Sequence, residues 1–76
     1  MNENVSNHEI GIRLRELRGV RTRTGVAKQI GISYSALCQY EYGIKLPNDA
    51  TKVKIANYYG KSVQDIFFNP KYDETT

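Results

Sequence analysis

Apolar side chains recur along the first part of the chain at intervals of three and four residues, a spacing that places them on one face of a helix. Ser6 and Glu9 have the spacing of a capping box, in which the serine hydroxyl accepts a hydrogen bond at the helix start. Gly19 is a stop signal. The pattern therefore predicts a helix that begins after Ser6 and runs to about Arg18. Its inner face carries Ile10, Leu14 and Leu17.

Two more short helices follow, joined by the three residues Gly31–Ser33. The threonines of the segment Arg21–Thr24 are candidate caps for the first of them. Gly31 ends that helix, because glycine adopts the left-handed conformation at little cost. Ser33 caps the second helix, and Gly43 ends it. The inward positions are Val26, Ala27 and Ile30 in the first helix, and Leu37 and Tyr40 in the second.

The C-terminal half predicts a fourth helix and a short fifth one. Pro47–Asn48 is typical of a turn and cap for the fourth helix, which ends at Gly60. Ser62 and Asp65 form a second capping box for the last helix, which begins at Val63 and ends at one of two adjacent phenylalanines. Strand-like alternation is lacking, so we expect an all-α fold, a compact bundle of five helices around one core. In the fourth helix Val53, Ile55, Ala56 and Tyr59 are predicted to face that core.

The length of 76 residues allows one small domain, which we place at residues 6–68, between a flexible arm (1–5) and a tail (69–76). A single cysteine and a single histidine exclude an internal disulfide and the common zinc sites, so we expect no metal and no cofactor. Apolar runs are too short for a membrane span, and the polar start lacks the apolar stretch of a signal peptide. We therefore expect a cytoplasmic protein with no membrane partner.

Positive charge is concentrated in one segment of the chain. From Arg13 to Lys28 six basic residues stand against one acid, Glu16, whereas the segment from Asp65 to Thr76 holds three acids and one lysine. A basic patch beside an acidic terminus suits a polyanion bound on one face. A solvated helix face explains the same charges equally well, so charge alone leaves both interpretations open.

The second and third predicted helices carry the clearest functional signal. Small Ala27 lets the two helices cross closely, and Gly31 allows a tight turn between them. Leu37 and Tyr40 anchor the second helix of the pair on the core. Such a pair is typical of a helix-turn-helix, whose second helix presents its N-terminal half to the major groove of DNA.

From about Ile10 to Phe67 the sequence resembles the lambda-repressor-like (Cro or Xre-type) helix-turn-helix family. The resemblance implies a transcriptional regulator that binds double-stranded DNA, most simply a dimeric repressor that reads a palindromic operator through the major groove. The family usually has glutamine at the first position of its second helix, where this chain has Arg23, and the loop before it is one residue longer here. The resemblance is carried by Leu14–Gly19, Val26–Ser33, Tyr40–Gly43, Pro47, Ile55–Ala56 and Ser62–Phe67.

The resemblance also assigns roles to individual residues. Gln39 is the first candidate for a base contact, since its amide can form two hydrogen bonds with adenine, and Tyr34 and Ser35 are expected beside it. The alternative is a merely solvated helix face. Arg15 and Glu41 occupy positions that pair in this family, which implies a partly buried ion pair rather than two independent surface charges. The expected phosphate contacts are Arg21, Arg23, Ser33, Tyr42 and Lys45.

Phe67 and Phe68 are adjacent, so both cannot point into one core from a short helix. One is expected to pack inward with Ile66, and the other is available to a partner or folds over its own domain. By resemblance, a twofold dimer forms here. Its predicted interface is Tyr58, Ile66, Phe67 and Phe68.

Two alternative functions, a protein-interaction module and an enzyme, are weighed against DNA binding. A rival function is a protein-interaction module, an antitoxin-like partner on the same fold, although the basic residues Arg21 and Arg23 near Gln39 favour DNA. An enzyme is excluded, because the sequence lacks a nucleophile–base pair, a paired-carboxylate site, a phosphate loop and a metal cluster. We also see no site for a small-molecule effector, so an antagonist protein is one route to release from DNA.

Cys38 is expected to be a passive residue rather than a redox switch, and His8 a surface residue.

Overall fold

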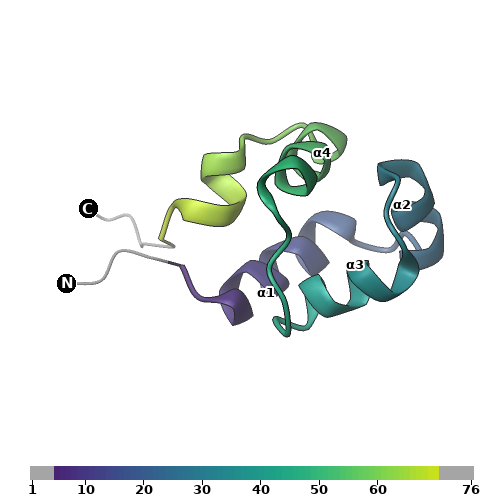
Figure 1. Cartoon of the computed structure of the whole chain (residues 1–76), viewed down its shortest axis with the longest axis horizontal. Coiled ribbons are helices and arrows are strands. Elements are labelled where there is room, and N and C mark those ends of the chain that lie inside the picture. The colour runs from purple at the N-terminus through teal and green to yellow at the C-terminus, as the bar shows by residue number, and fades with distance from the viewer. Residues whose placement is uncertain (1–4, 71–76) are drawn as a thin grey trace.

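The computed structural model describes residues 5–70, and within this range the regular secondary structure is all helical, without strands. The predicted all-α fold with five helical segments is confirmed. Of the predicted flexible arm (1–5) and tail (69–76), residues 1–4 and 71–76 lie outside the described residues. Helices within the described range are all too short and too polar to cross a membrane. The elements are α1 (Asn7–Arg18), α2 (Arg23–Ile30), α3 (Tyr34–Glu41), α4 (Asp49–Tyr59) and a π-helical turn, η1 (Gln64–Phe68) (Figure 1).

The helices begin where the capping residues predict. In each α-helix the side chain before the first helical residue accepts a hydrogen bond from the backbone N–H three positions later, at 2.9–3.0 Å. These interactions satisfy donors that a helix start otherwise leaves unpaired. Thr22, the first of the two candidate threonines, is the cap of α2. The four capping residues are Ser6, Thr22, Ser33 and Asn48.

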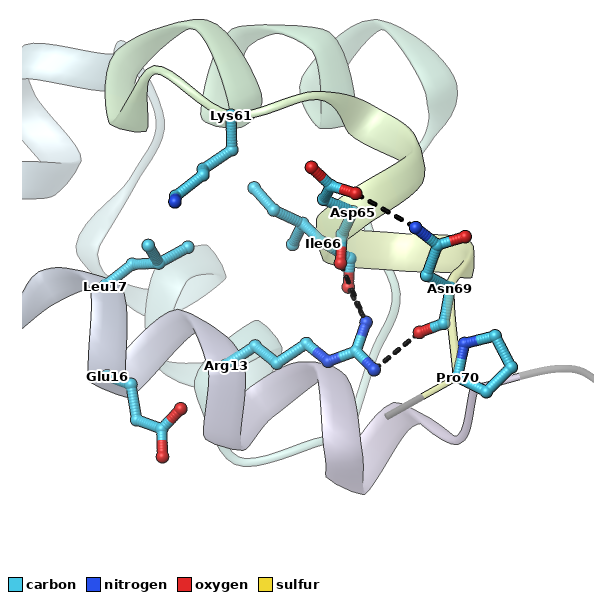
Figure 2. A pocket seen from close by; sticks show the side chains of 8 residues that line it. All are labelled: Arg13, Glu16, Leu17, Lys61, Asp65, Ile66, Asn69 and Pro70. Carbon is cyan, nitrogen blue, oxygen red and sulfur yellow. Dashed lines mark hydrogen bonds between the residues drawn. The ribbon is translucent and has the colours of Figure 1, made fainter. Parts of the chain in front are cut away.

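The last helical segment winds more widely than an α-helix. The N–H of Asn69 donates to the carbonyl of Gln64, five residues back, at 2.8 Å. From α1, the Arg13 guanidinium donates to the carbonyls of Asp65 and Ile66 at 2.9 and 3.0 Å, and to that of Asn69 (Figure 2). A cation on the free carbonyls of a helix end is favourable, so Arg13 fastens η1 to α1.

Ten apolar side chains form a single core shared by all five segments. One predicted core residue is wrong: Val53 is 49% exposed, and Lys52 takes the inward position with 8% exposure. The aliphatic stem of a lysine packs as an apolar chain while its charge stays near a favourable partner. Here the Lys52 ammonium lies 4.9 Å from the ring centroid of Phe68, 5.8 Å from that of Phe67 and 3.6 Å from the Asp49 carboxylate. The core is Ile10, Leu14, Val26, Ala27, Ile30, Leu37, Ile55, Ala56, Ile66 and Phe67.

The helix α1 packs very closely against the C-terminal end of α3. At the contact lies Gly11, which is buried in the middle of α1. A Cβ atom added to Gly11 would overlap the carbonyl oxygen of Glu41 and lie 2.9 Å from its carbonyl carbon. Only glycine permits this approach, and the approach fixes how the last turn of α3 sits on α1.

Candidate nucleic-acid interface

The helices α2 and α3 are joined by a tight three-residue turn. Gly31 has a φ of +93°, in the left-handed region that favours glycine. The N–H groups of Gly31 and Ile32 both donate to the carbonyl of Ala27, at 2.9 and 3.0 Å, which closes the end of α2. Ala27 is 2% exposed and Leu37 is fully buried, so α3 is anchored on the core beside α2. The result is a short helix with one face fixed and the other facing outward (Figure 1).

The outward face of α3 carries the three predicted base readers. Tyr34 and Ser35 are exposed, and Gln39 is half-buried one turn further along. Among the described residues, the side chains of Ser35 and Gln39 form no hydrogen bond. Cys38 lies between them, half-buried and free of a disulfide. The structure thus gathers Tyr34, Ser35 and Gln39 on one surface, while their contact with bases stays a prediction.

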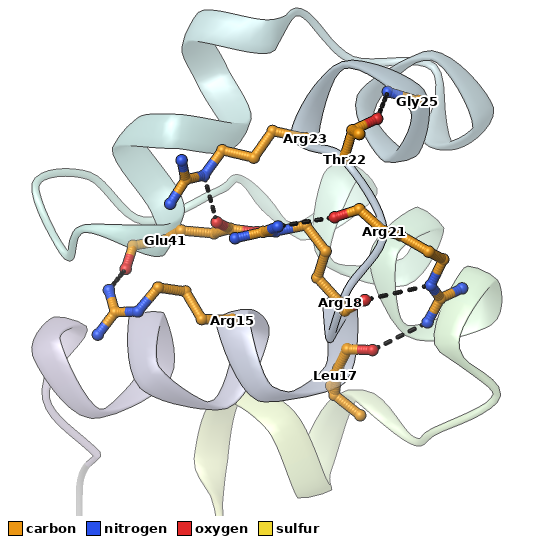
Figure 3. Close-up of polar contacts among 8 residues, drawn as sticks. All are labelled: Arg15, Leu17, Arg18, Arg21, Thr22, Arg23, Gly25 and Glu41. Atoms are coloured by element: carbon orange, nitrogen blue, oxygen red, sulfur yellow. Dashed lines mark hydrogen bonds and ion pairs between the residues drawn. The ribbon is translucent and has the colours of Figure 1, made fainter.

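Glu41, the last residue of α3, is the polar centre of the interface. Its side chain is 0% exposed, and each carboxylate oxygen accepts a hydrogen bond from a different guanidinium (Figure 3). Arg18 Nε donates to Oε2 at 2.8 Å, and Arg23 Nε donates to Oε1 at 2.7 Å. One buried carboxylate therefore links the end of α1, the start of α2 and the end of α3.

The predicted ion pair between Arg15 and Glu41 is wrong. Arg15 Nη1 donates to the backbone carbonyl of Glu41, and the carboxylate is bound by Arg18 and Arg23 instead. The reason is the direction of the glutamate side chain, which runs from the end of α3 toward the connection between α1 and α2 (Figure 3). Arg18 and Arg23 stand at the two ends of that connection, whereas Arg15 lies one turn earlier in α1.

Arg23 is held by a ring as well as by the carboxylate. Its guanidinium carbon lies 5.0 Å from the ring centroid of Tyr42, and the guanidinium carbon of Arg15 lies 5.9 Å from the same centroid. The hydrogen bond to Glu41 raises the pKa of Arg23, and partial burial opposes this effect. Arg23 therefore stays fully charged at the edge of the outward face of α3.

The other predicted phosphate contacts fall into two groups. Ser33, Tyr42 and Lys45 are exposed and lie just before or after α3. Arg21 is exposed too, but its guanidinium donates to the carbonyls of Leu17 and Arg18, at 2.9 and 3.2 Å, which close the end of α1 (Figure 3). It also lies 5.5 Å from the ring centroids of two α4 residues, Tyr58 and Tyr59. The structure thus turns Arg21 toward α4, and its phosphate contact stays a prediction.

The predicted dimer residues are divided between the core and the surface. Ile66 and Phe67 are 2% and 3% exposed, so their assignment to a surface contact is wrong. The turn of η1 directs both into the core and leaves Phe68 46% exposed, as expected for one of two adjacent phenylalanines. Tyr58 is half-buried, and its hydroxyl donates to Gln29 at 2.7 Å.

Tyr59, a half-buried residue of α4, brings a hydroxyl close to the charge of Glu41. The oxygen is buried and forms no hydrogen bond within the described residues. Burial, followed by the charge of Glu41, raises the pKa of Tyr59 to about 12. An unpaired buried hydroxyl costs free energy that a phenylalanine ring would not.

Tyr59→Phe is therefore expected to raise the free energy of unfolding by about 1 kcal/mol. The phenol ionises more readily in the unfolded chain, near pH 10, than in the folded one. Ionisation of this phenol therefore does not affect stability below about pH 10, and it lowers the stability of the fold increasingly as the pH rises toward about 12. Urea unfolding at pH 7 and across this alkaline range should show a higher midpoint and a smaller alkaline fall for Tyr59→Phe. Lower stability at pH 7 would show that the hydroxyl has a partner.

A short helix held outward after a three-residue turn defines the helix-turn-helix class of DNA-binding domain. The chain belongs to the helix-turn-helix family of the Cro and C1 type, whose family model matches residues 12–66. It is thus a member of a family of DNA-binding transcription regulators. The solution structure of the SOS-response transcriptional repressor LexA from Eubacterium rectale has the same fold, with a TM-score of 0.81 and 20% sequence identity. The match covers 100% of this chain and 83% of the LexA chain. No curated protein sequence matches the chain.

Proposed function

We propose that this protein is a sequence-specific transcriptional repressor of the cytoplasm that binds double-stranded DNA as a dimer. The observation that carries the proposal is the outward face of α3, which presents Tyr34, Ser35 and Gln39. Among the described residues, the side chains of Ser35 and Gln39 form no hydrogen bond. Exposed polar and basic groups flank this face. A helix anchored in this way enters the major groove with its N-terminal half. The name of the LexA neighbour, a transcriptional repressor, supports repression rather than activation.

Base reading and backbone contact are assigned to different residues. The Gln39 amide reads adenine through two hydrogen bonds, and Tyr34 and Ser35 contact the adjacent bases. Ser33 lies at the start of α3, while Tyr42 and Lys45 follow its end, and these positions support the proposal that the three residues contact phosphates on either side of the groove. Arg23 contributes a further phosphate contact from the start of α2.

The dimer brings two recognition helices to one operator. Phe68 is the exposed apolar residue of the predicted interface, and the half-buried Tyr58 is the second candidate. Two copies related by a twofold axis read a palindrome whose half-sites are about 34 Å apart, one turn of the double helix. Binding is relieved by an antagonist protein or by a fall in the concentration of the repressor itself.

Enrichment from a random duplex library tests this function, with the parent and Gln39→Ala treated in parallel at near-physiological salt. The parent should enrich a palindrome. Gln39→Ala should lose base preference at one position in each half-site, at a cost of about 1–3 kcal/mol.

A matched control is Asn57→Ala, which removes an exposed amide from α4 and should leave the base preference unchanged. If the parent and Gln39→Ala enriched duplexes with the same base preference at every position, Gln39 would not be a base-reading residue. Failure of the parent to enrich any sequence would contradict the function itself and favour the protein-interaction module.

A further inference from the structure

The arginines around Glu41, at the end of α3, differ in how many of their hydrogen-bond donors have a partner. Three guanidinium groups, those of Arg15, Arg18 and Arg23, contact this one residue, so two positive charges remain uncompensated there. Arg18 donates from Nε to Glu41 and from Nη1 to the carbonyl of Arg21 at 2.7 Å. Arg23 donates only from Nε, and within the described residues its two terminal nitrogens have no hydrogen-bond partner.

Two contacts fix the orientation of the Arg23 guanidinium. The hydrogen bond to Glu41 anchors Nε on a carboxylate that is fully buried and held by Arg18 on its other oxygen. The ring of Tyr42 covers the guanidinium at 5.0 Å. With Nε occupied, the opposite edge of the planar group carries both terminal nitrogens and points away from Glu41, as Figure 3 shows. The side chain is 24% exposed, so part of it reaches solvent.

We propose that Glu41 and Tyr42 are positioning residues that hold Arg23 as a fixed two-donor fork for one phosphate group of the DNA backbone. The inference rests on the proposed function and adds to it. The guanidinium fork matches two oxygens of one phosphate, and a fork that is already oriented loses little freedom on binding. Tyr42 supplies a ring to this arrangement, and the phosphate contact proposed above for its hydroxyl is separate from the fork.

Lysine is the discriminating replacement, because it keeps the charge and loses the fork. A single ammonium on a flexible chain cannot both bind Glu41 along one edge and present two parallel donors to a phosphate. We therefore expect Arg23→Lys to bind a selected duplex about tenfold more weakly than the parent, with a similar dependence on salt. Arg23→Gln, which removes the charge as well, should also reduce the salt slope by about one.

Tyr42 provides the test of positioning. Tyr42→Phe keeps the ring and removes only the hydroxyl with its own phosphate contact, so Tyr42→Leu should bind severalfold more weakly than Tyr42→Phe. In the Arg23→Lys background Tyr42→Leu and Tyr42→Phe should bind about equally, since the fork that the ring orients is already gone. Lys28→Gln, which removes an exposed charge from another face of α2, is the control for charge alone.

The measurement is the dissociation constant for the duplex selected by the parent, over a range of salt concentrations, with thermal unfolding to confirm that each variant is folded. Equal affinity of Arg23→Lys and the parent would overturn the proposal. A difference in affinity between Tyr42→Leu and Tyr42→Phe that is the same in both backgrounds would overturn it too. A parent that selects no duplex would instead refute the DNA-binding function, so the two failures are distinct.

Discussion

Glu41→Ala is expected to lower the free energy of unfolding by about 3 kcal/mol. Removal of one partner from a buried ion pair typically costs about 3–5 kcal/mol, because the remaining charge is left without compensation. We expect the lower end of this range because Arg18 and Arg23 are 15% and 24% exposed and can turn toward water. A loss of this size is a large part of the stability of a small domain.

Thermal unfolding of the parent and Glu41→Ala measures this effect directly. For a domain of this size, about 3 kcal/mol corresponds to a fall of about 12–24 °C in the midpoint. Glu41→Gln, which keeps the shape and one acceptor oxygen, should fall between the two. Arg15→Ala should cost less than Glu41→Ala, since Arg15 donates to the backbone carbonyl of Glu41 and not to its carboxylate. An unchanged midpoint for Glu41→Ala would contradict the central role of this carboxylate.

The second large effect on stability is expected from Gly11→Ala, which adds only one methyl group. Alanine is favoured over glycine within a helix by about 1 kcal/mol, so propensity alone predicts that Gly11→Ala stabilises α1. The structure predicts the opposite sign, because the added Cβ overlaps the carbonyl of Glu41, a backbone group that cannot turn aside. Overpacking typically costs about 1–3 kcal/mol, and we expect a net loss of about 2 kcal/mol once α1 shifts away from α3.

A second helical glycine provides the matched control. A Cβ on Gly25, in the first turn of α2, meets only the side-chain hydroxyl of Thr22, at 3.1 Å. Gly25→Ala should therefore change the stability by less than about 1 kcal/mol. Urea unfolding of both variants gives the comparison. If Gly11→Ala were as stable as the parent, the close contact between α1 and α3 would be wrong.

Helix limits and most of the core follow from local rules, and these rules are visible in the sequence. A cap such as Ser33 and a stop such as Gly31 act within a few residues, so their effect does not depend on the rest of the fold. The exchange of Val53 for Lys52 shows where this reasoning ends. Polarity assigns a lysine to the surface, but the helix register turns Lys52 inward, where its ammonium lies over the rings of Phe67 and Phe68.

The polar centre of the site could be predicted only in part, because it depends on three-dimensional proximity. Family resemblance identifies Glu41 as an ion-pair partner, but Arg15, Arg18 and Arg23 are all basic residues on neighbouring elements. Only the direction of the glutamate side chain decides among them. The close contact at Gly11 could not be predicted from the sequence, because a glycine within a helix looks the same whether it faces solvent or another backbone.

The central claim is that α3 reads a base sequence, and the ratio of two dissociation constants tests it most directly. The parent is titrated with the duplex it enriches and with a scrambled duplex of equal length, at near-physiological salt. A sequence-specific regulator should bind the enriched duplex at least about a thousandfold more tightly. Equal affinity for both duplexes, disappearing together as salt rises, would contradict the claim and leave only a generic polyanion surface.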